Sequence, residues 1–414
     1  MKKIKLFIMA ALLITTEVFS SGGSLYTRLG LGDLYNDYSA RRFAMGGLGI
    51  ALMDKDYLNY LNPAGLTDLR LVRFETGMYY IGENMQDNSS STYNANTFFS
   101  GFMFGIPLEH NLGITANFGV VPVTNVHYAS SQQGADTNFS SHTLDYNGQG
   151  GISKIFLSTS CKLPMDFSLG VSYDYYVGKI DYNSAITFTS ATDFKDATFS
   201  KQYSYHGMGF TAGLISGDLS KILPFGGIKD FKIGMIYSSS VSLHCDSIIS
   251  LTSSTETVET ALGTSNVSLP YKLGIGAAFI LQDNYQFTLD YLYQPFSQMT
   301  FGGVSFPYMQ DYRKMTLGFE YRNQDARATS FWDQVMLRGG LSYEKSQYIV
   351  NGTSINQISA YTGCSIPLGF DNSLDLALQF GRRGTKDNDL LQENIFNFAV
   401  SVSFGEIWFL RSER

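Results

Sequence analysis

The chain lacks any apolar run long enough to cross a bilayer as a helix. The run from Leu6 to Ile14 ends at Thr15, and no other segment comes closer to a spanning helix. A transmembrane helix needs about 20 apolar residues. A helical membrane protein is therefore excluded, although hydrophobic residues make up 44% of the 414 residues.

Cysteine, proline and positive charge are scarce as well. Cys161, Cys245 and Cys364 lie far apart and form no CxxC pair, so the sequence signals neither a disulfide framework nor a zinc site, although two of them can still oxidise after export. Only nine prolines occur, and 29 Lys and Arg stand against 36 Asp and Glu. We therefore expect no metal, no cofactor and no nucleic-acid partner.

Catalytic motifs are missing too. The five histidines form no HExxH motif, and no GxSxG stretch is present. Ser141 and His142 are neighbours in sequence, but adjacent residues of a strand face opposite ways and do not form a catalytic pair. The sequence therefore predicts no catalytic residues and a protein that is not an enzyme.

The N-terminus has the three parts of a secretory signal peptide in the expected order. Lysines at positions 2, 3 and 5 precede the apolar run, and small residues follow at Ser20 and Ser21. We predict cleavage after Ser20. Because residues 1–20 carry three Lys and one Glu, their removal changes the formal net charge from −7 to −9.

What the chain has in abundance is alternation with a period of two. In NIFNFAVSVSF, for example, the apolar face carries Phe396, Phe398, Val400, Val402 and Phe404. Phe and Tyr number 31 and 27 and tend to end these apolar faces, as in GMYY and GFEYRN. Such aromatic ends are typical of the girdles that flank the lipid-facing band of an outer-membrane barrel.

Fourteen stretches alternate in this way. They are residues 70–82, 94–107, 111–126, 147–161, 165–181, 198–215, 228–245, 268–281, 284–297, 311–323, 332–346, 354–367, 372–382 and 393–405. An exported sheet that faces lipid must close on itself. The sequence therefore predicts an all-β protein, a transmembrane antiparallel barrel of about 14 strands in the outer membrane of a Gram-negative cell. The alternative is a soluble secreted β-sandwich, whose strands are usually shorter.

The polar faces of these strands carry charge, which must be solvated or paired inside a barrel. The residues concerned are Arg73, Glu75, Asp290, Lys314, Glu320, Arg338, Glu344 and Asp375. The sequence predicts either a wet lumen or a plug held by ion pairs.

Residues 21–69 do not alternate. They contain the small residues Gly46, Gly47 and Gly49, then Asp54 and Asp56, and finally the turn Asn62-Pro63-Ala64-Gly65. Glycines allow close backbone contact, and Asn-Pro opens a turn. We expect this segment to fold compactly against the barrel wall; the alternative is a plain loop before the first strand.

This leader resembles that of the FadL family of outer-membrane long-chain fatty acid transporters and of their PorV-like relatives. The resemblance rests on the Ser-Ala-Arg start, the Met-Gly-Gly-Leu-Gly-Ile-Ala stretch, the acidic pair and Asn-Pro-Ala-Gly-Leu, and covers residues 38–69. It implies a hatch over 21–69 inside a barrel over 70–405. The hatch and gating residues would be Gly46, Gly47, Gly49, Asn62, Pro63, Ala64 and Gly65.

Two further features bear on mechanism. Pro122 cannot donate a ladder hydrogen bond, and by the resemblance it would mark a kink that opens the barrel sideways; the alternative is a strand that ends near Val121. Residues 406–414 form a C-terminal extension, GEIWFLRSER in context, which would either anchor at the membrane interface or dock a partner.

Two functions follow. The first is a passive outer-membrane channel for hydrophobic small molecules such as fatty acids, gated by the hatch and with lateral release into the membrane. The second is a PorV-like barrel that conducts nothing and binds a protein partner in secretion or surface attachment. A continuous apolar tunnel favours the first, and a lumen blocked by ion pairs favours the second.

Overall fold

The computed structural model describes residues 23–136, 139–188, 195–222, 226–253, 256–323, 330–369 and 371–406. The expected signal peptide, residues 1–20, and nearly all of the expected C-terminal extension lie outside the described residues. In the part that is described, no helix is both long and apolar enough to span a membrane.

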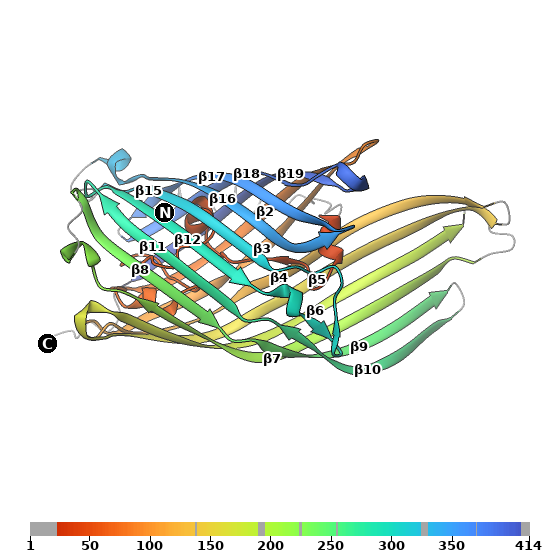
Figure 1. The fold of residues 1–414 in the computed structure, drawn as a ribbon, viewed down its shortest axis with the longest axis horizontal. Coiled ribbons are helices and arrows are strands. Elements are labelled where there is room, and N and C mark those ends of the chain that lie inside the picture. The colour runs from red at the N-terminus through yellow and green to blue at the C-terminus, as the bar shows by residue number, and fades with distance from the viewer. Residues whose placement is uncertain are drawn as a thin grey trace, which may run out of the picture.

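The wall is one antiparallel sheet whose strands follow each other in chain order (Figure 1). Its strands are β2 Val72–Gln86, β3 Ser91–Glu109, β4 Ile114–Asp136, β5 Phe139–Lys162, β6 Ser168–Phe188, β7 Ala197–Ile215, β8 Ile228–Ser238, β9 Val241–Ser253, β10 Thr257–Leu269, β11 Lys272–Leu281, β12 Tyr285–Gln294, β15 Tyr312–Tyr321, β16 Met336–Val350, β17 Thr353–Gly369, β18 Asn372–Gly384 and β19 Gln392–Glu406. β19 pairs with β2 and closes the barrel.

Two of the wall strands are each interrupted once. β8 and β9 both pair with β7, so they form one wall strand with a break. β10 pairs with β9 and β11 pairs with β8, so β10 and β11 form the next wall strand, which is broken at the same level. Over the described residues the barrel therefore has fourteen strands. This confirms the predicted barrel, since each of the fourteen alternating stretches overlaps a wall strand, although no predicted stretch covers residues 246–267, which belong largely to β9 and β10.

The short elements lie inside or at the ends of the barrel. They are η1 Leu25–Arg28, β1 Asp33–Leu34, α2 Ala40–Ala44, η2 Pro63–Leu66, η3 Pro164–Asp166, η4 Leu219–Lys221, η5 Phe296–Gln298, β13 Thr300–Phe301, β14 Val304–Ser305, η7 Phe331–Gln334 and η8 Asp387–Asp389.

The outside of the wall is more apolar than the inside. In β6 the outward Leu169, Val171 and Tyr173 are 36–55% exposed, whereas the inward Ser172 and Asp174 are buried. A soluble sandwich would have the opposite arrangement, while lipid favours this one. The soluble alternative is therefore wrong.

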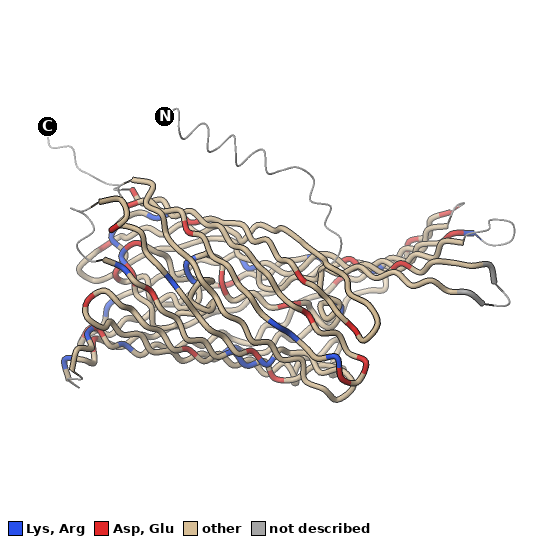
Figure 2. The backbone as a smooth tube through the Cα atoms, turned by 90° about the horizontal axis from the view of Figure 1, so that it is seen from above, with Lys and Arg blue, Asp and Glu red and all other residues tan. Residues whose placement is uncertain are grey.

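Six strands, β4, β5, β6, β7, β9 and β10, continue beyond this apolar belt and project from one end of the barrel (Figures 1 and 2). We call this part the projecting sheet. Its outward face becomes polar, as in Lys179 and Asp181 of β6. We take the opposite, flat end as periplasmic because the long extensions of outer-membrane barrels are extracellular.

Residues 23–71, which we call the inner segment, fill the lumen and supply about a third of the buried apolar residues, the wall supplying the rest. Leu48, Ile50, Leu58 and Leu66 are at most 1% exposed and pack in one cluster with inward wall residues such as Ile236. The apolar core therefore lies between the inner segment and the inner face of the wall, which sets the position of every site described below.

Candidate functional site

The glycine-rich stretch of the inner segment bends tightly against β12. Gly46, Gly47 and Gly49 have φ angles of +94°, +86° and +108°, in the region that favours glycine. The backbone N–H groups of Gly49 and Ile50 donate to the two carboxylate oxygens of Asp290, at 3.0 and 2.9 Å. A buried charge of the wall thus finds its partners in the backbone of the inner segment.

The Asn-Pro-Ala-Gly turn begins η2 and is tied to that same stretch. Asn62, which is fully buried, accepts a hydrogen bond from the Ala64 N–H at 3.1 Å through Oδ1. Its Nδ2 donates to the Ile50 carbonyl at 2.7 Å. Asn62 is therefore both the N-cap of the turn and the link between the two motifs singled out in the sequence.

The turn is seated on glycines of the wall. A Cβ added at Gly170 of β6 would clash with Pro63 and Ala64, and one at Gly213 of β7 would clash with Asn62. These two glycines let the strands approach the turn more closely than any other residue would allow. A plain loop before the first strand, which was the alternative expectation, would not need such close contacts with the wall.

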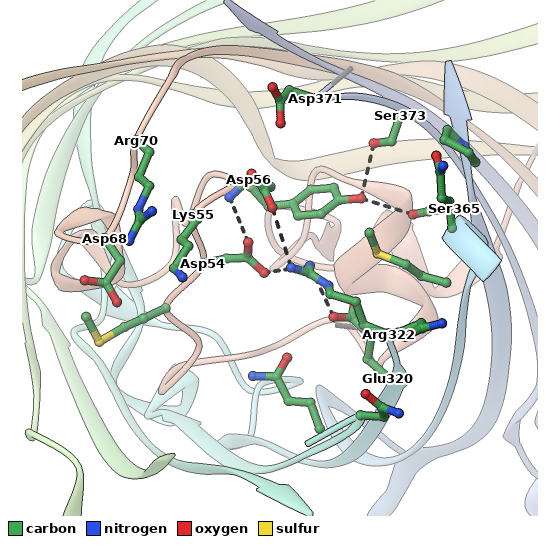
Figure 3. Close-up of a pocket in the computed structure, with 18 of the residues that line it drawn as sticks. Asp54, Lys55, Asp56, Asp68, Arg70, Glu320, Arg322, Ser365, Asp371 and Ser373 are labelled. Carbon is green, nitrogen blue, oxygen red and sulfur yellow. Dashed lines mark hydrogen bonds and ion pairs between the residues drawn. The ribbon is translucent and has the colours of Figure 1, made fainter. Parts of the chain in front are cut away.

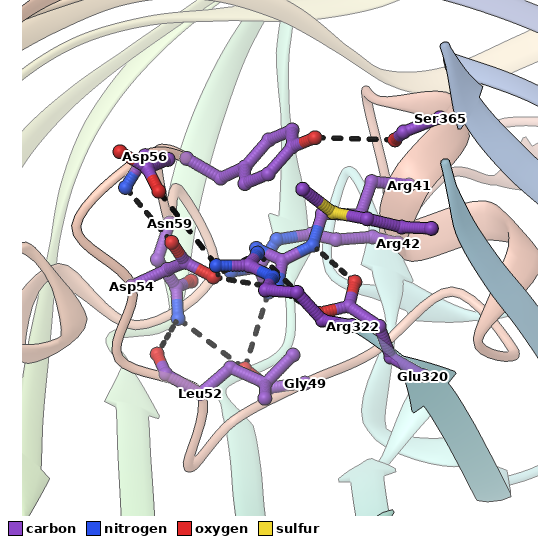
Figure 4. A network of polar contacts seen from close by, with 12 residues as sticks. Arg41, Arg42, Gly49, Leu52, Asp54, Asp56, Asn59, Glu320, Arg322 and Ser365 are labelled. Carbon is purple, nitrogen blue, oxygen red and sulfur yellow. Dashed lines mark hydrogen bonds and ion pairs between the residues drawn. The ribbon is translucent and has the colours of Figure 1, made fainter. Parts of the chain in front are cut away.

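Towards the flat end, buried ion pairs join the inner segment to the wall (Figure 4). Arg41 of α2 contacts Asp54 at 2.6 Å and Glu320 of β15 at 2.9 Å. Arg338 of β16 contacts the same Glu320 at 2.6 Å. Arg322 contacts Asp54 and Arg338 contacts Asp375, both at 2.9 Å. We call these six residues, Arg41, Asp54, Glu320, Arg322, Arg338 and Asp375, the ion-pair cluster.

The cluster balances three guanidinium groups against three carboxylates. The guanidinium groups also surround one ring, because the Cζ atoms of Arg41, Arg338 and Arg322 lie 4.1, 5.6 and 5.7 Å from the centroid of Tyr57. Burial raises the pKa of the Asp54 carboxyl, but Arg322 and Arg41 outweigh it and lower that pKa to about 2. Paired in this way, the charges are held in place without a net buried charge.

Below the cluster, a cavity of about 600 Å³ is open towards the flat end (Figure 3). Charged side chains of both signs line it, among them Lys55, Asp56, Asp68, Arg70 and Arg73. An apolar molecule gains nothing from such a lining. The straight route along the barrel axis therefore ends in a charged vestibule.

At the other end, a second set of ion pairs holds the start of the inner segment. Arg383 of β18 contacts Glu393 at 2.5 Å, Asp33 at 2.7 Å and Glu83 at 3.3 Å. Ser24 donates to Glu393 at 2.6 Å. Residues 24–33 are thus tied to β2, β18 and β19.

The wall itself has a seam between β3 and β4. The two strands pair only as far as Phe102 and Val120, after which β3 follows β2 and β4 follows β5. A bulge between Pro122 and Thr124 marks the place. The expected alternative, a strand that ends near Val121, is wrong, because β4 continues to Asp136.

The free edge of β4 above the seam is covered from inside by residues 23–35, which we call the strap. Leu34 of β1 pairs with Thr124, and the Tyr35 N–H donates to the Val123 carbonyl at 2.9 Å. The remaining space beside the strap is a cavity of about 20 Å³. That is room for about one water molecule.

The structure thus brings some of the singled-out residues together and leaves one apart. The three glycines and the Asn62–Gly65 turn meet through Ile50, whereas Pro122 lies at the seam, beside the strap. Of the two expectations for the charged inner faces, ion pairs to a plug are what the described residues form. Sequence reasoning missed Arg383 and its partners Asp33, Glu83 and Glu393, since no local pattern joins them.

Solved structures of similar fold include the toluene transporter TbuX of Ralstonia pickettii, with a TM-score of 0.62 and 16% identity over 90% of this chain and 99% of that one. A FadL homologue of Pseudomonas aeruginosa has a TM-score of 0.61 and 11% identity over 90% and 99%. The toluene transporter TodX of Pseudomonas putida has a TM-score of 0.60 and 16% identity over 90% and 98%. These likenesses confirm the FadL-type fold.

The fold and the lipid-facing belt make the protein an outer-membrane β-barrel, as predicted. No curated protein matches the sequence. One family model, described as BamG, matches residues 1–413. Because that match spans nearly the whole sequence, the chain belongs to the BamG family.

Proposed function

We propose that the protein is an outer-membrane channel for hydrophobic small molecules, such as fatty acids or monoaromatic hydrocarbons, which leave sideways through the seam when the strap moves. The observation that carries this proposal is the seam itself, a place where two neighbouring wall strands are unpaired and where, among the described residues, the strap covers the gap. Proteins of similar fold include a toluene transporter and a monoaromatic hydrocarbon channel, which supports the ligand class.

The upper lumen suits such ligands. Val126, Ile152, Ile180 and Leu243 point inward above the ion-pair cluster and are at most 1% exposed. These side chains are packed in one core cluster with the inner segment, so a ligand enters only when that packing opens, and each methylene group that it then buries gains about 0.8 kcal/mol relative to water. Since the charged vestibule blocks the axial route, the favourable path for an apolar molecule turns towards the seam.

The strap covers the seam, so it is the part of the inner segment that must move, and the contacts of Asp33 with Arg383 and of Ser24 with Glu393 must break when it does. Its pairing with β4 consists of two residues, Asp33 and Leu34, in register with Asn125 and Thr124. The Asn62–Gly65 turn is tied to β6 and β7 instead, and Arg41 is bound within the ion-pair cluster. In this proposal the turn, with Gly46, Gly47 and Gly49, is the fixed seat of the hatch, and the gate is the strap.

A disulfide across the strap tests the proposal. In a background with the three native cysteines replaced by serine, Leu34→Cys and Thr124→Cys would be oxidised to tie β1 to β4. The matched control pairs Ser342→Cys with Ser359→Cys, register partners on β16 and β17. Uptake of radiolabelled toluene and oleate into proteoliposomes is the measurement.

We expect the strap disulfide to abolish uptake until dithiothreitol is added, and the control disulfide to have no effect. Undiminished uptake through the tied strap would place the exit elsewhere. Absence of uptake by the unmodified protein would overturn the channel itself.

A second candidate function is favoured by the projecting sheet. On the face that continues the lumen, Tyr146, Phe199, Leu251 and Val258 are 37–49% exposed in a part of the chain that lies beyond the lipid belt. Water-exposed apolar patches of this kind mark interaction sites. With a lumen blocked by ion pairs, a non-conducting PorV-like partner protein is the alternative function.

This alternative predicts the reverse result in the same experiment. The unmodified protein would take up neither ligand and would purify with a stoichiometric protein partner. Leu251→Asp with Val258→Asp would remove that partner, because two carboxylates on the apolar face need to stay solvated.

A further inference from the structure

The outer surface of the wall is hollowed where β7, β8 and β11 meet. The hollow has a volume of about 720 Å³ and spans from β6 to β12. Its lining consists of Leu169, Ala212, Gly213, Leu214, Met235, Ile236, Tyr237, Leu273, Gly274, Ile275, Tyr291 and Tyr293. We call it the outer groove. It lies on the side of the barrel away from the lumen, and neither the seam nor the vestibule shares a lining residue with it.

The strands that form the outer groove contact the inner segment with their opposite, inward face. A Cβ added at Gly234 would lie 2.7 Å from the Ile50 carbonyl oxygen, and one at Gly274 would lie 2.7 Å from the Ile50 side chain. With Gly213, these inward glycines let three strands approach the inner segment closely. Because backbone contact with a buried core holds the strands there, the hollow is built into the fold.

The chemistry of the outer groove is that of a hydrocarbon site. Leu169, Leu214, Met235, Leu273 and Ile275 point outward and are 36–51% exposed. They lie in the same belt as other outward apolar residues, so the surrounding medium is lipid rather than water. An acyl chain is therefore the molecule that reaches this surface and fits its lining.

One end of the outer groove has a cationic border. Tyr293 is the penultimate residue of β12 and lies at the projecting, outer-leaflet end, and Arg313 lies with its Cζ 5.8 Å from the Tyr293 ring centroid. Lys345 is the register partner of Arg313 on the next strand. The Tyr293 hydroxyl donates to Asp311 at 2.9 Å. Arg313, Lys345 and Asp311 together carry a net charge of +1.

We propose that the outer groove binds one acyl chain of an outer-leaflet lipid whose anionic headgroup lies beside Arg313 and Lys345. The acyl chain then contacts the apolar lining of the groove, and the phosphate of the headgroup contacts the two cationic side chains. This site is independent of the channel, because no step of the proposed transport passes through it.

The test compares two tryptophan substitutions that both face lipid. Ala212→Trp fills the outer groove, whereas Leu341→Trp, at a belt position on β16 that is 55% exposed and lies outside the groove lining, is the matched control. The full chain, purified in mild detergent, would be titrated with phosphatidylglycerol, rough lipopolysaccharide and phosphatidylcholine. Native mass spectrometry then counts the lipids that stay bound, and heat-dependent gel mobility shows that each barrel is folded.

We expect one tightly held anionic lipid on the unmodified protein and on Leu341→Trp, and its loss in Ala212→Trp. Arg313→Gln with Lys345→Gln should weaken the anionic lipids about tenfold and leave phosphatidylcholine unchanged. Equal retention by the two tryptophan variants would overturn the site. Equal affinity for phosphatidylcholine and phosphatidylglycerol would overturn the assignment of the headgroup. A protein that retains none of the three lipids but binds toluene, with that binding lost in Ala212→Trp, would overturn the lipid and assign the groove to a free apolar ligand.

Discussion

Arg41 of the inner segment and Glu320 of β15 form a two-pronged ion pair, with the guanidinium Nε and Nη2 each 2.9 Å from a carboxylate oxygen. The residues are 279 positions apart in the chain and at most 2% exposed. This contact joins a five-residue helix in the lumen to the lipid-spanning wall, and the rest of the ion-pair cluster is built around it.

Replacing Arg41 by methionine should loosen the inner segment strongly. Asp54 and Glu320 would each lose a charged partner while buried, which costs about 3–5 kcal/mol in comparable cases. The midpoint of urea unfolding, followed by tryptic cleavage within the inner segment, measures the effect.

The control for that variant is Lys229→Ala, which breaks an ion pair with Asp283 whose side chains are 63% and 59% exposed. This change should cost less than about 1 kcal/mol. Similar urea midpoints for the two variants would contradict a structural role of the ion-pair cluster.

Asn62→Ala should destabilise the turn by about 1–2 kcal/mol. It removes the cap on the Ala64 N–H and the hydrogen bond to the Ile50 carbonyl, and both groups are buried. Protease resistance of residues 46–66 in the folded barrel is the readout. Asn88→Ala, in an exposed loop, should leave it unchanged.

Gly213→Ala tests the close approach of β7 to the turn. The added methyl group would overlap the Asn62 side chain, so either the turn or the strand must shift. We expect a folded barrel in which the inner segment is cut faster by trypsin. Gly226→Ala, where a Cβ would meet nothing within 4 Å, is the control and should behave as the unmodified protein.

The ion pairs of Asp54, which hold the inner segment in the lumen, should weaken at acidic pH. The pKa of Asp54 is lowered in the fold to about 2, from about 3.9 when unfolded, so its contribution is complete above about pH 4 and is lost as the pH falls towards 2. The free energy of unfolding lost in this way is about 2.6 kcal/mol. Unfolding measured from pH 6 to pH 2 should show this loss, and Asp54→Asn should be less stable at pH 6 but lose less on acidification.

Much of the wall was predictable because alternation is a local property. The pattern around Phe396 and Val400 requires only that one face of the strand meets lipid, and β19 is found there. Strand ends were less predictable. Residues 147–161 and 165–181 were expected, but β5 begins at Phe139 and β6 continues to Phe188, since outside the lipid belt the contrast between the two faces weakens.

The sequence by itself determined the period of two, the number of wall strands, the export signal and the small residues of the inner segment, because each depends on neighbours a few positions away. Only the tertiary structure decided which charges meet, where β3 and β4 part, and which glycines form the seat of Asn62. Barrel closure brings Arg41 to Glu320 and Asp33 to Arg383 across hundreds of residues, and the energy of a buried charge depends on that final geometry rather than on local pattern.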